Sequence, residues 1–148
     1  MKLLGFNFTK INAEKKLEFK STAINTDIEF LEIEKDKIEM LKDSEIIKIS
    51  FRFAVNYKEE AEKEEKKETK QENSGKISFE GTILFSTDKE ESKEILKAWK
   101  KKEIPPQFKV SIFNLILNKC SIKALSLEED LNLPYHVPLP KVQIQPKQ

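Results

Sequence analysis

The sequence predicts an α+β fold in which a four-stranded antiparallel sheet is followed by a short helix and a long apolar helix. Three observations predict it. Apolar residues alternate with polar ones up to about residue 86, helical spacing replaces this alternation afterwards, and all six prolines lie at or after Pro105. A chain of 148 residues has the length of one domain, so we expect residues 1–148 to form a single unit.

Four segments carry the period-two pattern of strands. The clearest is 47–57, where Ile, Phe, Val and Tyr alternate with Lys, Ser, Arg, Ala and Asn. The others are 77–85, 24–30 and a first segment at 6–8. One apolar and one mostly wet face predict an antiparallel sheet that is buried on one side. Gly81, inside the last strand, predicts a bulge or a close crossing of chains.

A charged insertion separates the third and fourth predicted strands. Residues 58–75 read KEEAEKEEKKETKQENSG and offer almost nothing apolar to bury. We expect a solvated hairpin insertion, in which pairs such as Glu59 and Lys63 could support a fluctuating helix.

Two helices are predicted after the strands. Asp88 and the two residues before it offer an N-cap for a short helix over 90–101, with Trp99 over the sheet edge. Pro105 and Pro106 end that helix and can start the next, which we expect over 107–127 or a little beyond. Its middle is apolar on nearly all sides, which indicates burial all round by the sheet and by a second subunit or an apolar ligand. The residues expected at a subunit interface are Ile112, Phe113, Ile116, Leu117 and Cys120.

The end of the chain, residues 131–148, is rich in proline. Pro134, Pro138 and Pro140 fall within seven residues. This spacing excludes a regular helix and favours an extended, polyproline-like backbone.

Composition excludes several classes of function. Three glycines are too few for a glycine-rich phosphate loop, and one His with one Cys cannot form a zinc site from those residues alone, so we expect no metal and no cofactor. A net charge of +1 argues against nucleic-acid binding. No run approaches the ~18 consecutive apolar residues that span a bilayer, so we expect no membrane insertion. A lone thiol indicates a reducing, cytoplasmic compartment.

No residues form a recognisable catalytic set, so we expect no enzyme. His136 lies in the proline-rich end and is interpreted as a packed or exposed histidine. Cys120 is interpreted as a buried small hydrophobe in the long helix. The acidic residues 128–130 are interpreted as a solvated helix end.

The ten phenylalanines are the most informative residue type. Core packing accounts for most of them, but a sheet and one long helix can hardly cover them all. Partly open aromatic grooves bind unfolded or extended chains with little sequence preference. The candidate contacts for such a polypeptide are Phe6, Phe8, Phe30, Phe51, Phe53, Phe79, Phe85 and Trp99.

The order of elements resembles the SecB family of preprotein-export chaperones. The matching pieces are ISFEGTILF (77–85), EESKEILKAWKK (90–101), FKVSIFNLILNKCSIKAL (108–125) and LNLPYHVPLPKV (131–142). The resemblance implies a subunit of a dimer of dimers, with long helices near the interface and apolar grooves that hold unfolded clients without ATP. Two departures are visible. No second helix follows the L-P motif, and the chain is nearly neutral where family members are acidic and dock on the export motor.

The sequence therefore predicts an ATP-independent holdase chaperone, with protein export as one setting. Its expected partners are unfolded polypeptides or preproteins and further copies of itself, as a dimer or tetramer. Two alternatives stay open. One is a protein-interaction module or oligomeric scaffold whose apolar surface binds one fixed partner, and the other is a small apolar ligand in the cleft between sheet and helix.

Overall fold

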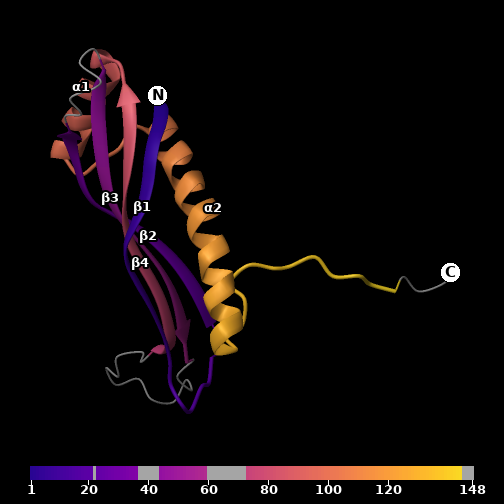
Figure 1. The fold of residues 1–148 in the computed structure, drawn as a ribbon. Helices are drawn as coiled ribbons and strands as arrows, with labels where there is room; N and C mark the ends of the chain where they lie inside the picture. Colours follow the sequence, from indigo (N-terminus) through magenta and orange to yellow (C-terminus); the bar gives the residue numbers. More distant parts are fainter. Residues whose placement is uncertain (22, 37–43, 60–72, 145–148) are drawn as a thin grey trace.

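The computed structural model describes residues 1–21, 23–36, 44–59 and 73–144. Its elements follow one another as β1 (Lys2–Lys15), β2 (Ala23–Asp36), β3 (Glu45–Lys58), β4 (Asn73–Thr87), α1 (Lys89–Lys100) and α2 (Pro106–Leu131). Figure 1 shows α2 lying along one face of the twisted sheet, with α1 at one end. The predicted α+β class, four antiparallel strands followed by a short and a long apolar helix, is confirmed.

The sheet has the strand order β1-β4-β3-β2, and every neighbouring pair is antiparallel. β3 and β4 are central, so their inward side chains are fully covered, whereas β1 and β2 are edge strands. The rings of Phe53 and Phe79, which are cross-strand partners, stack with their centroids 5.8 Å apart. The apolar residues that alternate in the sequence therefore point into this core, and the residues between them point to the opposite face of the sheet.

Gly81 marks the close approach that its position in a strand predicted. A Cβ atom there would lie 2.7 Å from Cζ of Phe51 and would also collide with the backbone oxygen of Asn7. Gly81 pairs with Phe8, next to a register shift in β1 between Phe8 and Lys10. The Phe51 ring therefore occupies the space in which a side chain at position 81 would lie.

The helix boundaries follow from capping. The Asp88 carboxylate accepts a hydrogen bond from the Glu91 amide at 2.8 Å, which starts α1 as predicted. Pro106 starts α2. The helix continues to Leu131 and ends at Asn132, which adopts the left-handed conformation with φ 53°. It is therefore four residues longer at its end than the 127 boundary expected.

One stripe of α2 packs against the sheet. It repeats every four residues and consists of Phe108, Ile112, Ile116, Cys120, Ala124 and Glu128. Ile112, Ile116 and Cys120 are thus core residues, which corrects their assignment to a subunit interface. Phe113 is only partly covered and Leu117 is exposed, so these two stay candidates for that interface.

By length and composition, α2 could also cross a membrane. The expectation that no segment could do so overlooked it, because a helix needs a high mean hydropathy and not an unbroken apolar run. In this fold its inner stripe packs against the sheet.

The hairpin between β3 and β4 is shorter than predicted. β4 begins at Asn73, Ser74 is buried, and Gly75 pairs with Tyr57, so residues 73–75 belong to the sheet and not to the charged insertion. Lys58, at the other end of the predicted insertion, also belongs to the sheet, and residues 60–72 lie outside the described residues. After α2 the chain has no regular element through residue 144 and leads away from the body in Figure 1, as the prolines predicted.

Candidate polypeptide-binding surface

The phenylalanine core continues outward onto β1. Phe6 lies 5.3 Å from Phe51 and 5.3 Å from Phe8, measured between ring centroids, and Phe8 lies 5.3 Å from the core ring of Phe79. Phe6 and Phe8 are only partly covered. Leu3 and Ile11, whose strand partners are Phe85 and Phe79, are 42% and 47% exposed. We call these four apolar residues the β1 strip: Leu3, Phe6, Phe8 and Ile11.

A second apolar strip lies at the other edge of the sheet. Ile28 and Phe30 are partly covered, and Ile24 at its end is exposed. The Phe30 ring meets Phe113 of α2 edge-on, with centroids 5.2 Å apart. We call Ile24, Ile28 and Phe30 the β2 strip.

The width of the sheet explains both strips. Four strands spaced about 4.8 Å apart are wider than one helix with a diameter of about 10 Å. α2 contacts β1, β3 and β4 and reaches β2 through Phe113, but one helix cannot cover the full width, so apolar side chains on both edge strands stay half open on the helix side of the sheet.

The structure separates the predicted polypeptide contacts into two groups. Phe51, Phe53, Phe79 and Phe85 are buried in the core, which corrects their assignment to the binding surface. The other four side chains are partly exposed, so their assignment to the binding surface stays a prediction: Phe6, Phe8, Phe30 and Trp99.

Trp99 lies over the β2 edge, as expected. Its indole N–H donates to Oε1 of Glu32 at 3.2 Å, and the ammonium of Lys102 lies 4.4 Å from the centre of its ring. A register shift in β2 between Phe30 and Glu32 separates the indole from the β2 strip. Trp99 therefore borders this strip and does not belong to it.

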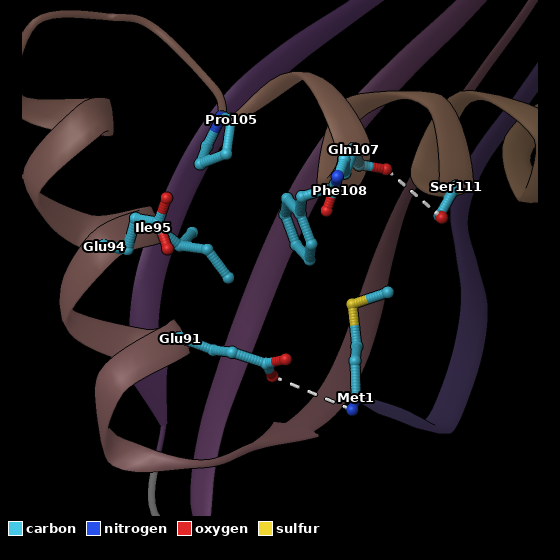
Figure 2. A pocket seen from close by; sticks show the side chains of 8 residues that line it. All are labelled: Met1, Glu91, Glu94, Ile95, Pro105, Gln107, Phe108 and Ser111. Carbon is cyan, nitrogen blue, oxygen red and sulfur yellow. Dashed lines mark hydrogen bonds and ion pairs between the residues drawn. The ribbon is translucent and has the colours of Figure 1, made fainter.

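A pocket of about 270 Å³ opens between α1 and the start of α2 (Figure 2). Ile95 and Phe108 form its apolar side, whereas Glu91 and Glu94 line it with carboxylates. The amino group of Met1 lies 3.7 Å from the Glu91 carboxylate. This mixed and charged lining does not suit a small apolar ligand. The pocket lies between the two helices, so the alternative of such a ligand between sheet and helix stays open.

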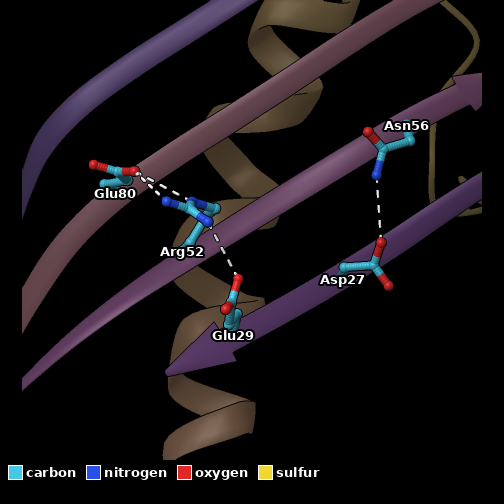
Figure 3. A network of polar contacts seen from close by, with 5 residues as sticks. All are labelled: Asp27, Glu29, Arg52, Asn56 and Glu80. Carbon is cyan, nitrogen blue, oxygen red and sulfur yellow. Dashed lines mark hydrogen bonds and ion pairs between the residues drawn. The ribbon is translucent and has the colours of Figure 1, made fainter. Parts of the chain in front are cut away.

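The opposite face of the sheet is polar (Figure 3). Arg52 donates to Glu80 at 3.0 Å and to Glu29 at 3.2 Å, and Asn56 donates to Asp27 at 3.3 Å. The hydrogen bond to Glu80 raises the pKa of Arg52 above its ordinary value. Both apolar strips therefore belong to the helix side of the sheet.

A buried polar network lies where α2 ends, and the sequence did not reveal it. The Glu128 carboxylate is fully buried and accepts hydrogen bonds from the Tyr57 hydroxyl and from the His136 amide, the latter at 2.9 Å. Its other oxygen lies 2.7 Å from Nδ1 of His136, and Nε2 of that ring lies 3.3 Å from the Ser121 hydroxyl. Burial, followed by the bond to Glu128, raises the pKa of Tyr57. We call these four side chains the Glu128 network: Tyr57, Ser121, Glu128 and His136.

The interpretation of Glu128 as part of a solvated helix end is therefore wrong. The spacing of four that runs from Phe108 through Ala124 reaches 128 next, and this was the signal that could have placed its side chain inward. His136 is a packed residue, which was one of the two readings. Its ring contacts the ring of Phe53 edge-on, with centroids 6.1 Å apart, and this contact holds the chain after Leu133 against the sheet.

Ser121, His136 and Glu128 stand in the relation of a nucleophile, a base and an orienting acid. Hydrolysis also needs donors for the oxyanion. Ser121 lies in the middle of α2, where each backbone N–H is bonded to the carbonyl four residues earlier, and the His136 amide is bonded to Glu128. We therefore assign the Glu128 network a structural role.

The described part of the chain holds no group of three or more His, Cys, Asp or Glu side chains that could bind a metal ion. Cys120 is fully buried, and this burial raises the pKa of its thiol to about 12. Such a thiol is unreactive at neutral pH.

Comparisons with known proteins assign no family to this chain. No protein-family model matches the chain, and no curated protein matches its sequence. A solved structure of a SecB-like chaperone of Mycobacterium tuberculosis, in complex with a ChAD peptide from the HigA1 antitoxin, aligns with 99% of this chain and 92% of that chain. The TM-score is 0.44 and the sequence identity 13%. A similarity at this level assigns neither a partner nor an activity to this chain.

Proposed function

We propose that this protein is an ATP-independent holdase that binds unfolded polypeptides along the β1 and β2 strips. The observation that carries the proposal is the continuity between the phenylalanine core and half-open side chains at both sheet edges. Such a surface offers apolar contact without a defined pocket, which suits clients of varied sequence.

The mechanism is burial of apolar side chains of the client. Each large side chain that leaves water contributes ~1.5–3 kcal/mol, so a few contacts hold a segment while weak single contacts still allow release. This contribution has no direction, and it needs no nucleotide. The strips lie on edge strands, whose outer backbone groups can also bond to an extended chain.

Self-association is the second part of the proposal. On the side of α2 that faces away from the sheet, Val110 and Ile122 are 60% and 73% exposed, and Leu117 is also exposed. We propose that further copies cover this face. A fixed partner at the same face is the alternative, in which the protein is an interaction module and not a chaperone. We further propose a cytoplasmic setting, because the single thiol forms no internal disulfide, and we keep protein export as the setting to test.

Suppression of aggregation tests the binding surface directly. We compare Leu3→Asn/Ile11→Asn, which changes the β1 strip, with Val110→Asn/Ile122→Asn, which changes the outer face of α2. All four side chains are exposed, so both variants should fold. The first should suppress aggregation of several unrelated denatured proteins about tenfold less well per mole, and the second should act like wild type.

The opposite pattern would favour the interaction module. If the β1 variant protects clients as well as the wild type does, the strips do not hold them. If only one of the denatured proteins is bound, the surface serves a fixed partner. Light scattering of both variants shows whether the outer face of α2 carries the assembly.

A further inference from the structure

After His136 the described part of the chain continues as an arm that its own body leaves mostly uncovered. His136 is fixed in the Glu128 network, and the following residues 137–144 lead away from the body (Figure 1). Val142 and Ile144 are 102% and 97% exposed, and Leu139 is also exposed. We call residues 137–144 the arm. Three exposed apolar side chains on an extended, proline-bearing segment require a partner.

The arrangement of prolines gives the arm one bonding edge. In an extended chain, alternate residues direct their N–H and C=O groups to the same edge. Pro138 and Pro140 therefore leave one edge without two of its donors, while Val137, Leu139 and Lys141 keep theirs on the other. Proline in sheets is confined to such edge strands, with its side of the strand turned to solvent.

The first half of β2 provides a matching edge. Among the described residues, β2 pairs with β3 alone, so its outer backbone groups lack a strand partner. α1 packs against the second half, where Trp99 bonds to Glu32, which leaves residues 23–30 open.

Charge and polarity favour the same pairing. Residues 23–30 carry Asp27 and Glu29 and no cation, whereas the arm carries Lys141 and no acid. In an extended arm Val142 and Ile144 fall on one face and suit the β2 strip, while Lys141 and Leu139 fall on the other face, the side on which Asp27 and Glu29 lie. The other edge strand is the weaker match, because β1 carries Lys2, Lys10 and Lys15 against the single acid Glu14.

We propose that the arm of one copy adds as a fifth strand to residues 23–30 of β2 in a second copy. Exchange of the two arms gives a closed dimer, in which Pro138 and Pro140 face solvent and prevent the addition of a further strand. This pairing uses neither the β1 strip nor the outer face of α2, but it covers the β2 strip, so the arm would compete there with the clients of the proposed holdase.

Cysteine cross-linking tests the pairing in the full-length protein. We mix a chain carrying Leu139→Cys with a differently tagged chain carrying Thr26→Cys, and treat the mixture with a short bismaleimide. The matched control replaces Thr26→Cys by Thr9→Cys, which is also an exposed threonine in an edge strand. The native thiol Cys120 is buried and gives no background.

The expected result is a linked pair of unlike chains with Thr26→Cys at a yield at least fivefold above that with Thr9→Cys. Equal yields, or no link with Thr26→Cys, would overturn the proposal. A Thr26→Cys/Leu139→Cys chain that links only within itself would also overturn it, because the arm would then cover its own β2.

Hydrogen exchange provides an independent measurement. A chain that ends at His136 keeps the Glu128 network and loses the arm. Amides within 23–30 should then exchange at least tenfold faster than in the full chain, while amides of β1 keep their rates. Unchanged exchange in 23–30 at high protein concentration would contradict the pairing.

Discussion

The buried carboxylate of Glu128 organises the contacts at the end of α2. A fully buried carboxylate is costly unless its oxygens accept hydrogen bonds, and here Tyr57 and His136 supply the donors. These bonds hold residues from β3, α2 and the following segment together. The position where the chain leaves the body is thus fixed by these polar contacts together with the burial of Leu133 in the core.

Removing one donor should therefore destabilise the fold. Tyr57→Phe keeps the ring and deletes the hydroxyl, so we expect a loss of ~1–3 kcal/mol in the free energy of unfolding. Urea unfolding followed by circular dichroism measures it. Tyr135→Phe is the matched control, because that ring is exposed and should cost almost nothing. Equal stability of both variants would show that Glu128 keeps enough partners without Tyr57.

The same buried groups predict a loss of stability in alkali. The pKa of Cys120 is raised to about 12 and that of Tyr57 is raised as well, so the folded state keeps protons that the unfolded chain releases above about pH 8.5 for a thiol and about pH 10 for a phenol. The unfolded state then binds fewer protons, and stability falls as pH rises. Denaturant midpoints between pH 7.5 and 10.5 should decline, and Cys120→Ala should decline less steeply than wild type. A flat profile would contradict the burial of these groups.

At the scale of elements, the crossing at Gly81 is the tightest point of the sheet. Gly81→Ala should destabilise the protein by ~1–3 kcal/mol, because the added methyl group meets the Phe51 ring and the backbone of β1. Gly5→Ala provides the comparison, since the nearest atom there, Cδ1 of Leu84, lies 4.0 Å away. Thermal unfolding should show a lower melting temperature for Gly81→Ala than for the wild type, and an unchanged one for Gly5→Ala. A tolerated Gly81→Ala would mean that β1 and Phe51 move apart easily.

The elements were predictable because each carries a local signal. Alternation revealed β3, and Asp88 and Pro106 revealed where the helices begin. Which side of α2 faces the sheet was not predictable in the same way, because that helix is apolar all round and its periodicity is weak. The assignment of Ile116 to an interface failed for that reason, and Glu128 was missed because a single acidic residue gives no sign of its partners in other elements.

The candidate surface was predictable only in part. Composition indicated more aromatic side chains than one helix covers, and the half-open Phe6, Phe8 and Phe30 agree with that expectation. It could not distinguish them from Phe51 or Phe79, because the difference lies in the strand order. β1 and β2 are edges, whereas β3 and β4 are central.

For the whole molecule, a net charge of +1 predicts binding that resists salt. Exposed charges are screened beyond ~8 Å at physiological ionic strength, whereas apolar burial is not weakened by moderate salt. Trp99 borders the β2 strip and is the only tryptophan, so an unfolded polypeptide should shift its fluorescence. About 0.5 M NaCl should leave that shift in place. Its disappearance with salt would show that charge and not apolar contact holds the client.

The strand order also governs how the chain folds during synthesis. Lys2 pairs with Ser86 and Lys15 with Gly75, so β1 is synthesised before its neighbour β4 and has to wait for it. At ~5–20 residues per second this wait is on the order of ten seconds. Until then Phe6 and Phe8 lack their neighbouring strand β4, and Phe8 lacks the ring of Phe79, while β2 and β3 can already form a hairpin. The nascent chain thus passes through a stage in which it is itself an exposed apolar polypeptide, of the kind that the finished surface is proposed to hold.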